Sequence, residues 1–314
     1  MTVAQVAGSI LANVERVIVG KADVVELALV ALLCEGHILI EDVPGIGKTT
    51  LAKGLARSLD CTFRRIQCTP DLLPSDVTGT YFFNQRSQEF EFRPGPVVAN
   101  VVLADELNRA TPRTQSSLLE CMQERQLTVD GDTRPLPRPF LVIATQNPIE
   151  LEGTFPLPEA QLDRFVLKLG LGYPTSEEEE LMTRRFERAA PLDTLQPVSS
   201  GPELLALQDE CRRVYVADAV RHYSVQLIRA TREHPAVQLG ASPRATLALL
   251  SASQALAAIR GREFVIPDVA KLHAVAVLSH RLILKPEARL RGRTRESVVE
   301  EVLGTVPVPV EDLK

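Results

Sequence analysis

The chain has 314 residues, of which 45% are hydrophobic and 24% charged, and its 35 basic and 40 acidic residues give a net charge of −5. This length predicts one large or two smaller domains with a self-sufficient core, and the composition excludes a disordered or collagen-like chain. The mild acidity disfavours coating of nucleic acid. An aromatic content of 4%, without tryptophan, disfavours a base-stacking platform.

The cysteines and the first residues indicate the cellular compartment. The five cysteines are scattered, and no two are spaced for a metal site, so we expect reduced thiols, mostly buried. The first twenty residues lack the basic and apolar segments of a secretory signal, and no apolar run is long enough to span a bilayer. A cytoplasmic protein without a membrane span is therefore expected.

In the first half of the chain, short apolar runs alternate with helical patterns. Strands are expected at residues 37–40, 62–68, 100–105, 140–145 and 164–169. Helices are expected from Lys48 onward, where leucines recur at a spacing of four, and over residues 112–124. This alternation predicts an α/β fold with a mostly parallel sheet covered on both faces.

Two segments interrupt the alternation and are expected to be insertions. Residues 81–98 contain short extended pieces and a cluster of phenylalanines, Phe82, Phe83, Phe90 and Phe92. Residues 127–136 contain Asp130-Gly131, a hairpin signal because both residues tolerate a positive φ.

The pattern changes near residue 173. Thr175 or Ser176 can cap a helix that begins with the acidic run Glu177–Glu180, and acidic residues suit a helix N-terminus. The chain then reads as almost purely helical, with apolar helices expected at 245–259 and 268–283. We expect an α/β domain over residues 1–172, a linker with one helix over 173–195 and an all-α domain over 196–314.

The segment after the first expected strand resembles the phosphate-binding P-loop, G-x-x-x-x-G-K-[ST], with Asp42 in place of the first glycine. Small residues let successive N–H groups surround a phosphate at a helix N-terminus, a lysine reaches the outer phosphates and a hydroxyl holds Mg²⁺. The residues expected around the nucleotide are Val43, Pro44, Gly45, Ile46, Gly47, Lys48, Thr49 and Thr50.

The apolar run at 100–105 ends in two carboxylates, Asp105 and Glu106. A buried strand places them at the carboxyl edge of the sheet, where ligands bind in open α/β folds. Asp105 is expected to hold Mg²⁺ together with Thr49, and Glu106 to polarise an attacking water as general base. Downstream of a P-loop, the pair indicates nucleoside triphosphate hydrolysis rather than binding alone.

Asn147 follows the next expected strand. In a functional interpretation, its neutral amide orients the attacking water or contacts the γ-phosphate. In a structural interpretation, Asn147-Pro148 only begins a turn. The residues alone leave both interpretations open.

Together these motifs resemble the AAA+ ATPases, and within them the MoxR family. The resemblance covers nearly the whole chain and includes ADELNRA at 104–110, TQSSLLE at 114–120, TPDLLPSDVTG at 69–79 and FPLPEAQLDRF at 155–165. It implies that residues 1–172 form the nucleotide-binding domain and residues 196–314 a helical lid. Residues 81–98 would be the helix-2 insert and 127–136 the pre-sensor-1 hairpin, which face the central pore in related machines.

The resemblance also implies roles for individual residues. Asn147 becomes sensor 1, Arg164 the arginine finger inserted into a neighbouring subunit's site, and Arg244 sensor 2, reaching the γ-phosphate from the lid. Arg109 and Arg113 are rival interface arginines. The residues that line the adenine pocket would be Ile18, Val19 and Gly20.

The function implied by the resemblance is Mg²⁺-dependent ATP hydrolysis by a ring, most often a hexamer, that remodels or matures a partner complex in a chaperone-like way. The partner is often a von Willebrand factor A domain protein. The alternatives are a DNA-remodelling or magnesium-chelatase-like motor and a nucleotide-switched scaffold with little turnover. The basic segment 281–295 forms either a solvated lid face or a site for nucleic acid or an acidic partner.

Overall fold

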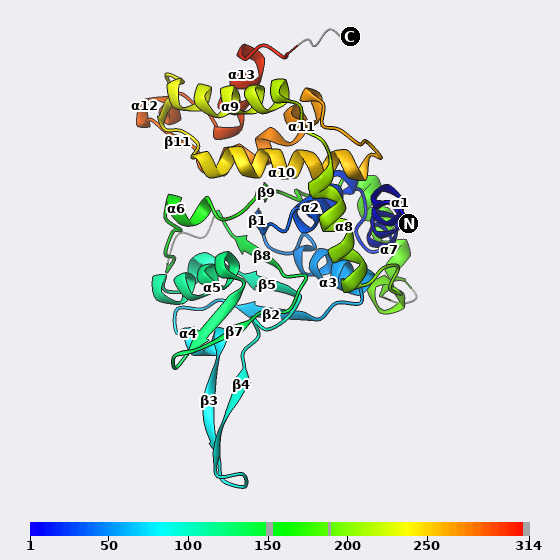
Figure 1. The fold of residues 1–314 in the computed structure, drawn as a ribbon, viewed down its shortest axis with the longest axis vertical. Coiled ribbons are helices and arrows are strands. Elements are labelled where there is room, and N and C mark those ends of the chain that lie inside the picture. The colour runs from blue at the N-terminus through cyan, green and yellow to red at the C-terminus, as the bar shows by residue number, and fades with distance from the viewer. Residues whose placement is uncertain (149–152, 188–189, 310–314) are drawn as a thin grey trace.

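The structure is a computed structural model that describes residues 1–148, 153–187 and 190–309. A sheet-based part contains most of the first half of the chain, and a helical part stacked on it contains most of the second half (Figure 1). A long hairpin, β3 (Gly79–Asn84) with β4 (Glu89–Pro94), extends from the end opposite the helical part (Figure 1).

Within the described residues, the central sheet has five parallel strands in the order β2–β5–β8–β1–β9. They are β1 (Ile38–Glu41), β2 (Phe63–Gln67), β5 (Val101–Asp105), β8 (Leu141–Gln146) and β9 (Leu167–Leu169). The expected α/β class with a parallel sheet is confirmed. The fifth strand starts later than expected, because α6 (Glu159–Leu162) and the turn after it take up Arg164.

Both faces of the sheet are buried. On β1, Ile38 and Ile40 belong to one apolar cluster, and Leu39 between them belongs to the other, as the alternation of a strand requires. In the first half of the chain, the helices that contribute to the first cluster are α1 (Val3–Glu15), α2 (Ala22–Leu33) and α3 (Lys48–Ser58), and those that contribute to the second are α4 (Pro74–Thr78) and α5 (Pro112–Glu124).

The second insertion is also an antiparallel hairpin, formed by β6 (Gln126–Val129) and β7 (Asp132–Pro135). Its turn residues Asp130 and Gly131 have φ of 51° and 89°, which is the conformation that the Asp-Gly signal predicts.

After residue 173, the regular elements that the structure describes are helices, apart from the short strand pair β10 (Val237–Leu239) and β11 (Ile283–Leu284). Thr175 caps the first helix by accepting from the Glu178 N–H. The helix expected at 268–283 ends at Leu278. The elements are α7 (Ser176–Phe186), η2 (Pro191–Thr194), α8 (Gly201–Arg213), α9 (Asp218–Glu233), α10 (Pro243–Ile259), α11 (Pro267–Leu278), η3 (Ser279–Arg281), α12 (Pro286–Leu290) and α13 (Arg295–Thr305).

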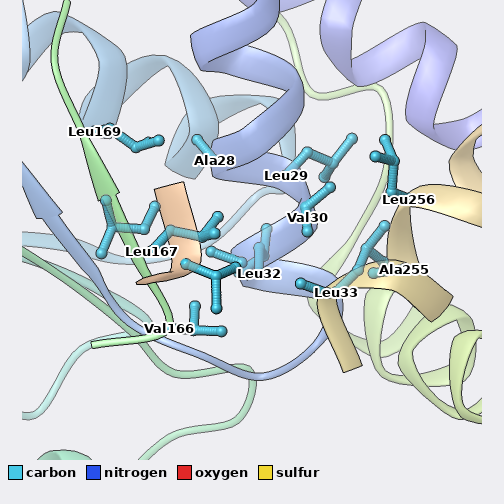
Figure 2. Close-up of a cluster of buried hydrophobic side chains, with 14 of the residues drawn as sticks. Ala28, Leu29, Val30, Leu32, Leu33, Val166, Leu167, Leu169, Ala255 and Leu256 are labelled. Carbon is cyan, nitrogen blue, oxygen red and sulfur yellow. The ribbon is translucent and has the colours of Figure 1, made fainter. Parts of the chain in front are cut away.

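Helix α2 joins the sheet to the helical part. Its side chains pack on Leu167 and Leu169 of β9 and on Ala255 and Leu256 of α10 (Figure 2). A helix that is apolar nearly all round is a buried one, and α2 has this character. The first apolar cluster therefore runs without a break from the sheet into the helical part.

The five cysteines form no disulfide in the structure, and Cys68, Cys121 and Cys211 are buried, in line with the expectation that most of them are buried. Among the helices that the structure describes, none is both long and apolar enough to cross a membrane.

Candidate functional site

The P-loop connects the end of β1 to the first residue of α3. Gly45 and Gly47 have φ of 85° and 94°, a left-handed conformation that glycine adopts without the steric penalty of a side chain. Gly47 is the N-cap of α3, so the loop and the positive end of the helix face the same space. This arrangement suits an anion.

Asp42, the residue that replaces the first glycine of the general motif, fixes the loop in place. One carboxylate oxygen accepts from the Val43 N–H at 2.8 Å, and the other accepts from the Gly172 N–H at 2.7 Å. The start of the P-loop is thus tied to the segment after β9. The Val43 N–H is engaged by this contact, and Val43 lines neither of the cavities described below.

Lys48 Nζ donates to the backbone carbonyl of Asp42 at 2.6 Å. Partial burial lowers the pKa of Lys48, and the carboxylates of Asp42, Asp105 and Glu106 oppose this shift. The ammonium group is therefore bonded to the loop itself, and the three carboxylates favour its charged form.

The two carboxylates lie at the end of β5, as expected, and β8 positions them. Thr145 Oγ1 donates to Asp105 Oδ1 at 2.7 Å and accepts from the Glu106 N–H at 2.8 Å. Glu106 has a φ of 57°, a conformation that costs a non-glycine residue energy and recurs at functional sites. The buried Thr145 thus fixes the strained backbone that presents Glu106.

Two residues that the sequence analysis missed reach the carboxylates from β2, which pairs with β5. Arg65 contacts Asp105 Oδ2 through Nη2 at 2.6 Å and Nε at 3.1 Å. Gln67 Nε2 donates to Glu106 Oε2 at 3.1 Å. The sequence signal that could have found them is the position of Arg65 and Gln67, two polar residues at i and i+2 near the carboxyl end of β2.

Most of the residues predicted to bind the nucleotide line two adjoining cavities. The first, of about 380 Å³, is lined by Lys48, Thr49, Arg65, Asp105, Glu106, Thr145 and Asn147. The second, of about 420 Å³, is lined on one side by Val17, Ile18, Val19 and Ile46. Both are also lined by Pro44, Gly45, Gly47 and Thr50. The arrangement is that of a two-part site, polar at one end and apolar at the other.

Gly20 lines neither cavity, and its role is steric. Its φ is 71°, and the Glu178 side chain occupies the space where a Cβ atom would lie. The glycine therefore permits the close approach of α7 to the segment that contains Ile18 and Val19.

The polar cavity has suitable donors for Mg²⁺. The Thr49 hydroxyl and the Asp105 carboxylate both line it, and Mg²⁺ prefers oxygen ligands, usually one or two carboxylates together with substrate phosphates. The described residues contain no group of three or more His, Cys, Asp and Glu that could enclose a metal by itself. The residues present fit a magnesium ion that arrives with a phosphorylated substrate.

Arg164 and Arg244 lie outside both cavities. Arg164 donates to the Leu119 carbonyl of α5 at 2.7 Å, and Arg244 is exposed at the start of α10. Ser242, the N-cap of α10, donates to Asp163 at 2.7 Å, so the segments carrying the two arginines are in contact. In Figure 1, α6 beside Arg164 and α7 beside the apolar cavity lie on opposite sides of the sheet.

The other arginines considered in the sequence have different surroundings. Arg109 contacts Glu106 of the same chain at 3.3 Å, and Arg113 is exposed on α5. Arg281, interpreted from sequence as part of a basic surface segment, has a side chain that is only 2% exposed and contacts Asp163 at 2.7 Å. The basic segment is therefore not a uniform solvated face, because its first cation is buried in an ion pair.

Comparison with known proteins gives matches along nearly the whole chain. The model of the ATPase family associated with various cellular activities (AAA) matches residues 37–167, and an AAA lid domain model matches residues 229–302. The uncharacterized protein YeaC of Bacillus subtilis is 50% identical over 97% of this chain and 95% of its own length. Chaperone MoxR1 of Mycobacterium tuberculosis is 46% identical over 95% of this chain and 81% of its own length.

The similarity extends to a more distant relative and to a solved structure. Protein MoxR of Paracoccus denitrificans is 30% identical, over 95% of both chains. A crystal structure of a candidate ATPase from Cytophaga hutchinsonii has a TM-score of 0.92 and 39% identity, and the alignment covers 98% of this chain and 96% of the other.

Proposed function

The chain belongs to the MoxR family of AAA+ ATPases, and on that premise we propose that it hydrolyses ATP with Mg²⁺ in a ring of subunits and remodels or matures a partner protein. One observation carries the catalytic part of this proposal. A single cavity is lined by residues that are far apart in the sequence, namely Lys48, Asp105, Glu106 and Asn147. This cavity adjoins an apolar one, because the two share P-loop residues.

The roles follow from chemistry and position. Lys48 would release the Asp42 carbonyl and bind the outer phosphates, while the P-loop N–H groups hold the phosphate chain. Glu106 would accept a proton from the attacking water, and Asn147 would orient that water or the γ-phosphate. Thr49 and Asp105 would hold Mg²⁺, which supplies neutralisation of the phosphate charge when bound.

The proposal of a ring is supported by the arginines. Arg164 and Arg244 lie outside the subunit's own cavities, and the Ser242–Asp163 hydrogen bond brings their segments together. We propose Arg164 as the arginine that reaches the phosphates of an adjacent subunit, and Arg244 as the sensor-2 arginine of the lid. An arginine supplied across an interface is worth roughly 10³–10⁵ in rate in phosphoryl transfer. A hexamer is the assembly that we propose.

For the partner, we propose a von Willebrand factor A domain protein or another protein client. The β3–β4 hairpin supports a client-contacting role, since Phe82, Phe83 and Phe90 on it are 44%, 48% and 71% exposed. The Phe83 and Phe90 rings contact each other edge to face across the two strands, which stiffens the hairpin near its tip.

Binding and turnover measured on two variants test the catalytic proposal. Lys48→Ala should abolish detectable ATP binding in a fluorescent-nucleotide titration, whereas Lys53→Ala, an exposed lysine of the same helix, should leave it unchanged. Glu106→Gln should bind ATP normally and release phosphate about 10²–10⁴-fold more slowly. Wild-type turnover in Glu106→Gln would remove Glu106 from the mechanism, and a wild-type protein that binds ATP without turnover would be a nucleotide-switched scaffold.

A further inference from the structure

Asp163, the residue before Arg164, is bonded to two residues of the lid. One carboxylate oxygen accepts from Arg281 Nε at 2.7 Å, and the other accepts from the Ser242 hydroxyl at 2.7 Å. Both partners lie in the segment that the lid domain model matches. In Figure 1, α6, which ends just before Asp163, lies below the helical part on the side of β11 and α12. Both oxygens of this carboxylate therefore connect the sheet-based part to the lid.

The Arg281 guanidinium group binds the backbone on both sides of Arg164. It donates to the carbonyl of Asp163 at 3.3 Å, and it also donates to the carbonyls of Phe165 at 2.7 Å and Val166 at 3.2 Å. The Arg281 side chain is buried, and so is Phe165. Because a guanidinium group has five N–H donors in a rigid plane, its bonds fix the acceptors relative to one another. The backbone that carries Arg164 is thus held by a residue of the lid.

The side chain of Arg164 is held much less firmly than its backbone. It is half-buried, and Nη1 donates to the Leu119 carbonyl, the one hydrogen bond that the side chain makes within the described residues. A cation with a single bond to a neutral carbonyl can exchange it for a phosphate, because hydrogen bonds between charged groups are stronger than bonds to neutral ones. The guanidinium group of Arg164 can therefore change its partner while its backbone stays in place.

Ser242 connects Asp163 to the first turn of α10. The hydroxyl that donates to Asp163 also accepts from the Arg244 N–H at 3.1 Å, which makes Ser242 the N-cap of this helix. A hydroxyl group can donate and accept at the same time. The segment of the lid that contains Arg244 and the segment that contains Arg164 are thus joined by two side chains.

We propose that Asp163 is a positioning residue for Arg164, through which the lid of one subunit sets the place of the arginine that acts on the nucleotide of the next subunit. This inference rests on the trans role proposed for Arg164. The bonds to the Asp163 carboxylate come from two elements of the lid, α10 and η3, so the backbone of Arg164 follows the lid. Placement matters because a shift of about 1 Å in a group that acts on the substrate can cost about 10²-fold in rate.

The test weakens this connection in the subunit that supplies the arginine. Ser242→Ala removes one bond to Asp163 and keeps the buried ion pair with Arg281, so the fold is retained. Arg164→Ala subunits, which keep Glu106, are mixed in equal amounts with Glu106→Gln/Ser242→Ala subunits, and phosphate release is measured. The activity should be about three- to tenfold lower than in the mixture of Arg164→Ala with Glu106→Gln, since one hydrogen bond to the positioning carboxylate is lost.

Two further variants separate positioning from loss of a helix cap. Ser200 is the N-cap of α8 and accepts from the Glu203 N–H, so Ser200→Ala removes a cap of the same kind at a residue that is not bonded to Asp163. In the subunit that supplies the arginine, Ser200→Ala should leave the activity of the mixture within about twofold. Ser242→Thr should restore it, because a threonine hydroxyl also caps a helix and donates.

The final arm places Ser242→Ala in the other subunit, together with Arg164→Ala, and mixes it with Glu106→Gln. The loss should then be at least threefold smaller, because this subunit supplies no arginine to its neighbour. An equal loss in both placements, or no loss in the first, would overturn the positioning role of Asp163. Absence of activity in the mixture without Ser242→Ala would instead overturn the trans role of Arg164 itself, so the two failures are distinguishable.

Discussion

Arg65 and Asp105 form a close ion pair between neighbouring strands, in which two guanidinium nitrogens contact Oδ2 of the carboxylate at 2.6 and 3.1 Å. The carboxylate that we propose for Mg²⁺ therefore already has a cation beside it. Arg65 lines the same cavity as the P-loop, so we expect its guanidinium group to compete with Mg²⁺ for this carboxylate.

The first prediction concerns this competition. Arg65→Ala should lower the Mg²⁺ concentration that gives half-maximal nucleotide binding by about two- to fivefold, a modest effect because the Arg65 side chain is 49% exposed and the pair is screened by solvent. Titration of Mg²⁺ against a fluorescent ATP analogue measures it. Arg64→Ala, on the adjacent exposed position, is the control. An increased Mg²⁺ requirement would show instead that Arg65 assists metal or phosphate binding.

The second prediction concerns catalysis across subunits. Arg164→Ala and Glu106→Gln should each be nearly inactive, since one removes the proposed finger and the other the proposed base. Mixed in equal amounts, they should regain about a quarter of wild-type phosphate release, because one interface in four combines an intact glutamate with an intact arginine. The control is a mixture of Arg164→Ala subunits with the double variant Arg164→Ala/Glu106→Gln, because no interface in it has an intact arginine. Without recovery in the first mixture, Arg109, Arg113 or Arg244 becomes the candidate finger.

The third prediction concerns stability. Arg281 is nearly fully buried and bonded to Asp163, and it also donates to the carbonyls of Phe165 at 2.7 Å and Val166 at 3.2 Å. Arg281→Met leaves the Asp163 carboxylate without its cation, so the free energy of unfolding should fall by about 3–5 kcal/mol. Arg289→Met, an exposed arginine of α12, should change it by less than about 0.5 kcal/mol. Urea denaturation followed by circular dichroism compares the two.

Much of the fold could be predicted because its signals are local. The alternation of apolar runs with helical patterns located the strands of the sheet, and the capping residue Thr175 marked the start of α7. The strand expected from Arg164 onward was partly wrong. There, Asp163 is fixed by Ser242 and Arg281, and contacts with residues so distant in the chain leave no local pattern.

The candidate site likewise contains residues that could be predicted from local motifs and residues that could not. The P-loop and the carboxylates at the end of β5 are contiguous motifs, and the structure brings them together in one cavity. Arg65 and Gln67 were missed because only the pairing of β2 with β5 places them beside Asp105 and Glu106. Met182 and Phe186 of α7, which also line the apolar cavity, were missed because exposed apolar residues on a short acidic helix carry no signal until the cavity beneath them is known.

The apolar cluster that α2 shares with β9 and α10 has a mechanical consequence (Figure 2). A hinge between the sheet and the helical part would have to separate side chains such as Leu33 and Leu256, both fully buried, and expose them to water. We therefore expect the sheet and the helical part of one subunit to move together. In the ring that we propose, a rotation of whole subunits against their neighbours would then be enlarged at the end of the β3–β4 hairpin, which extends away from the rest of the molecule (Figure 1).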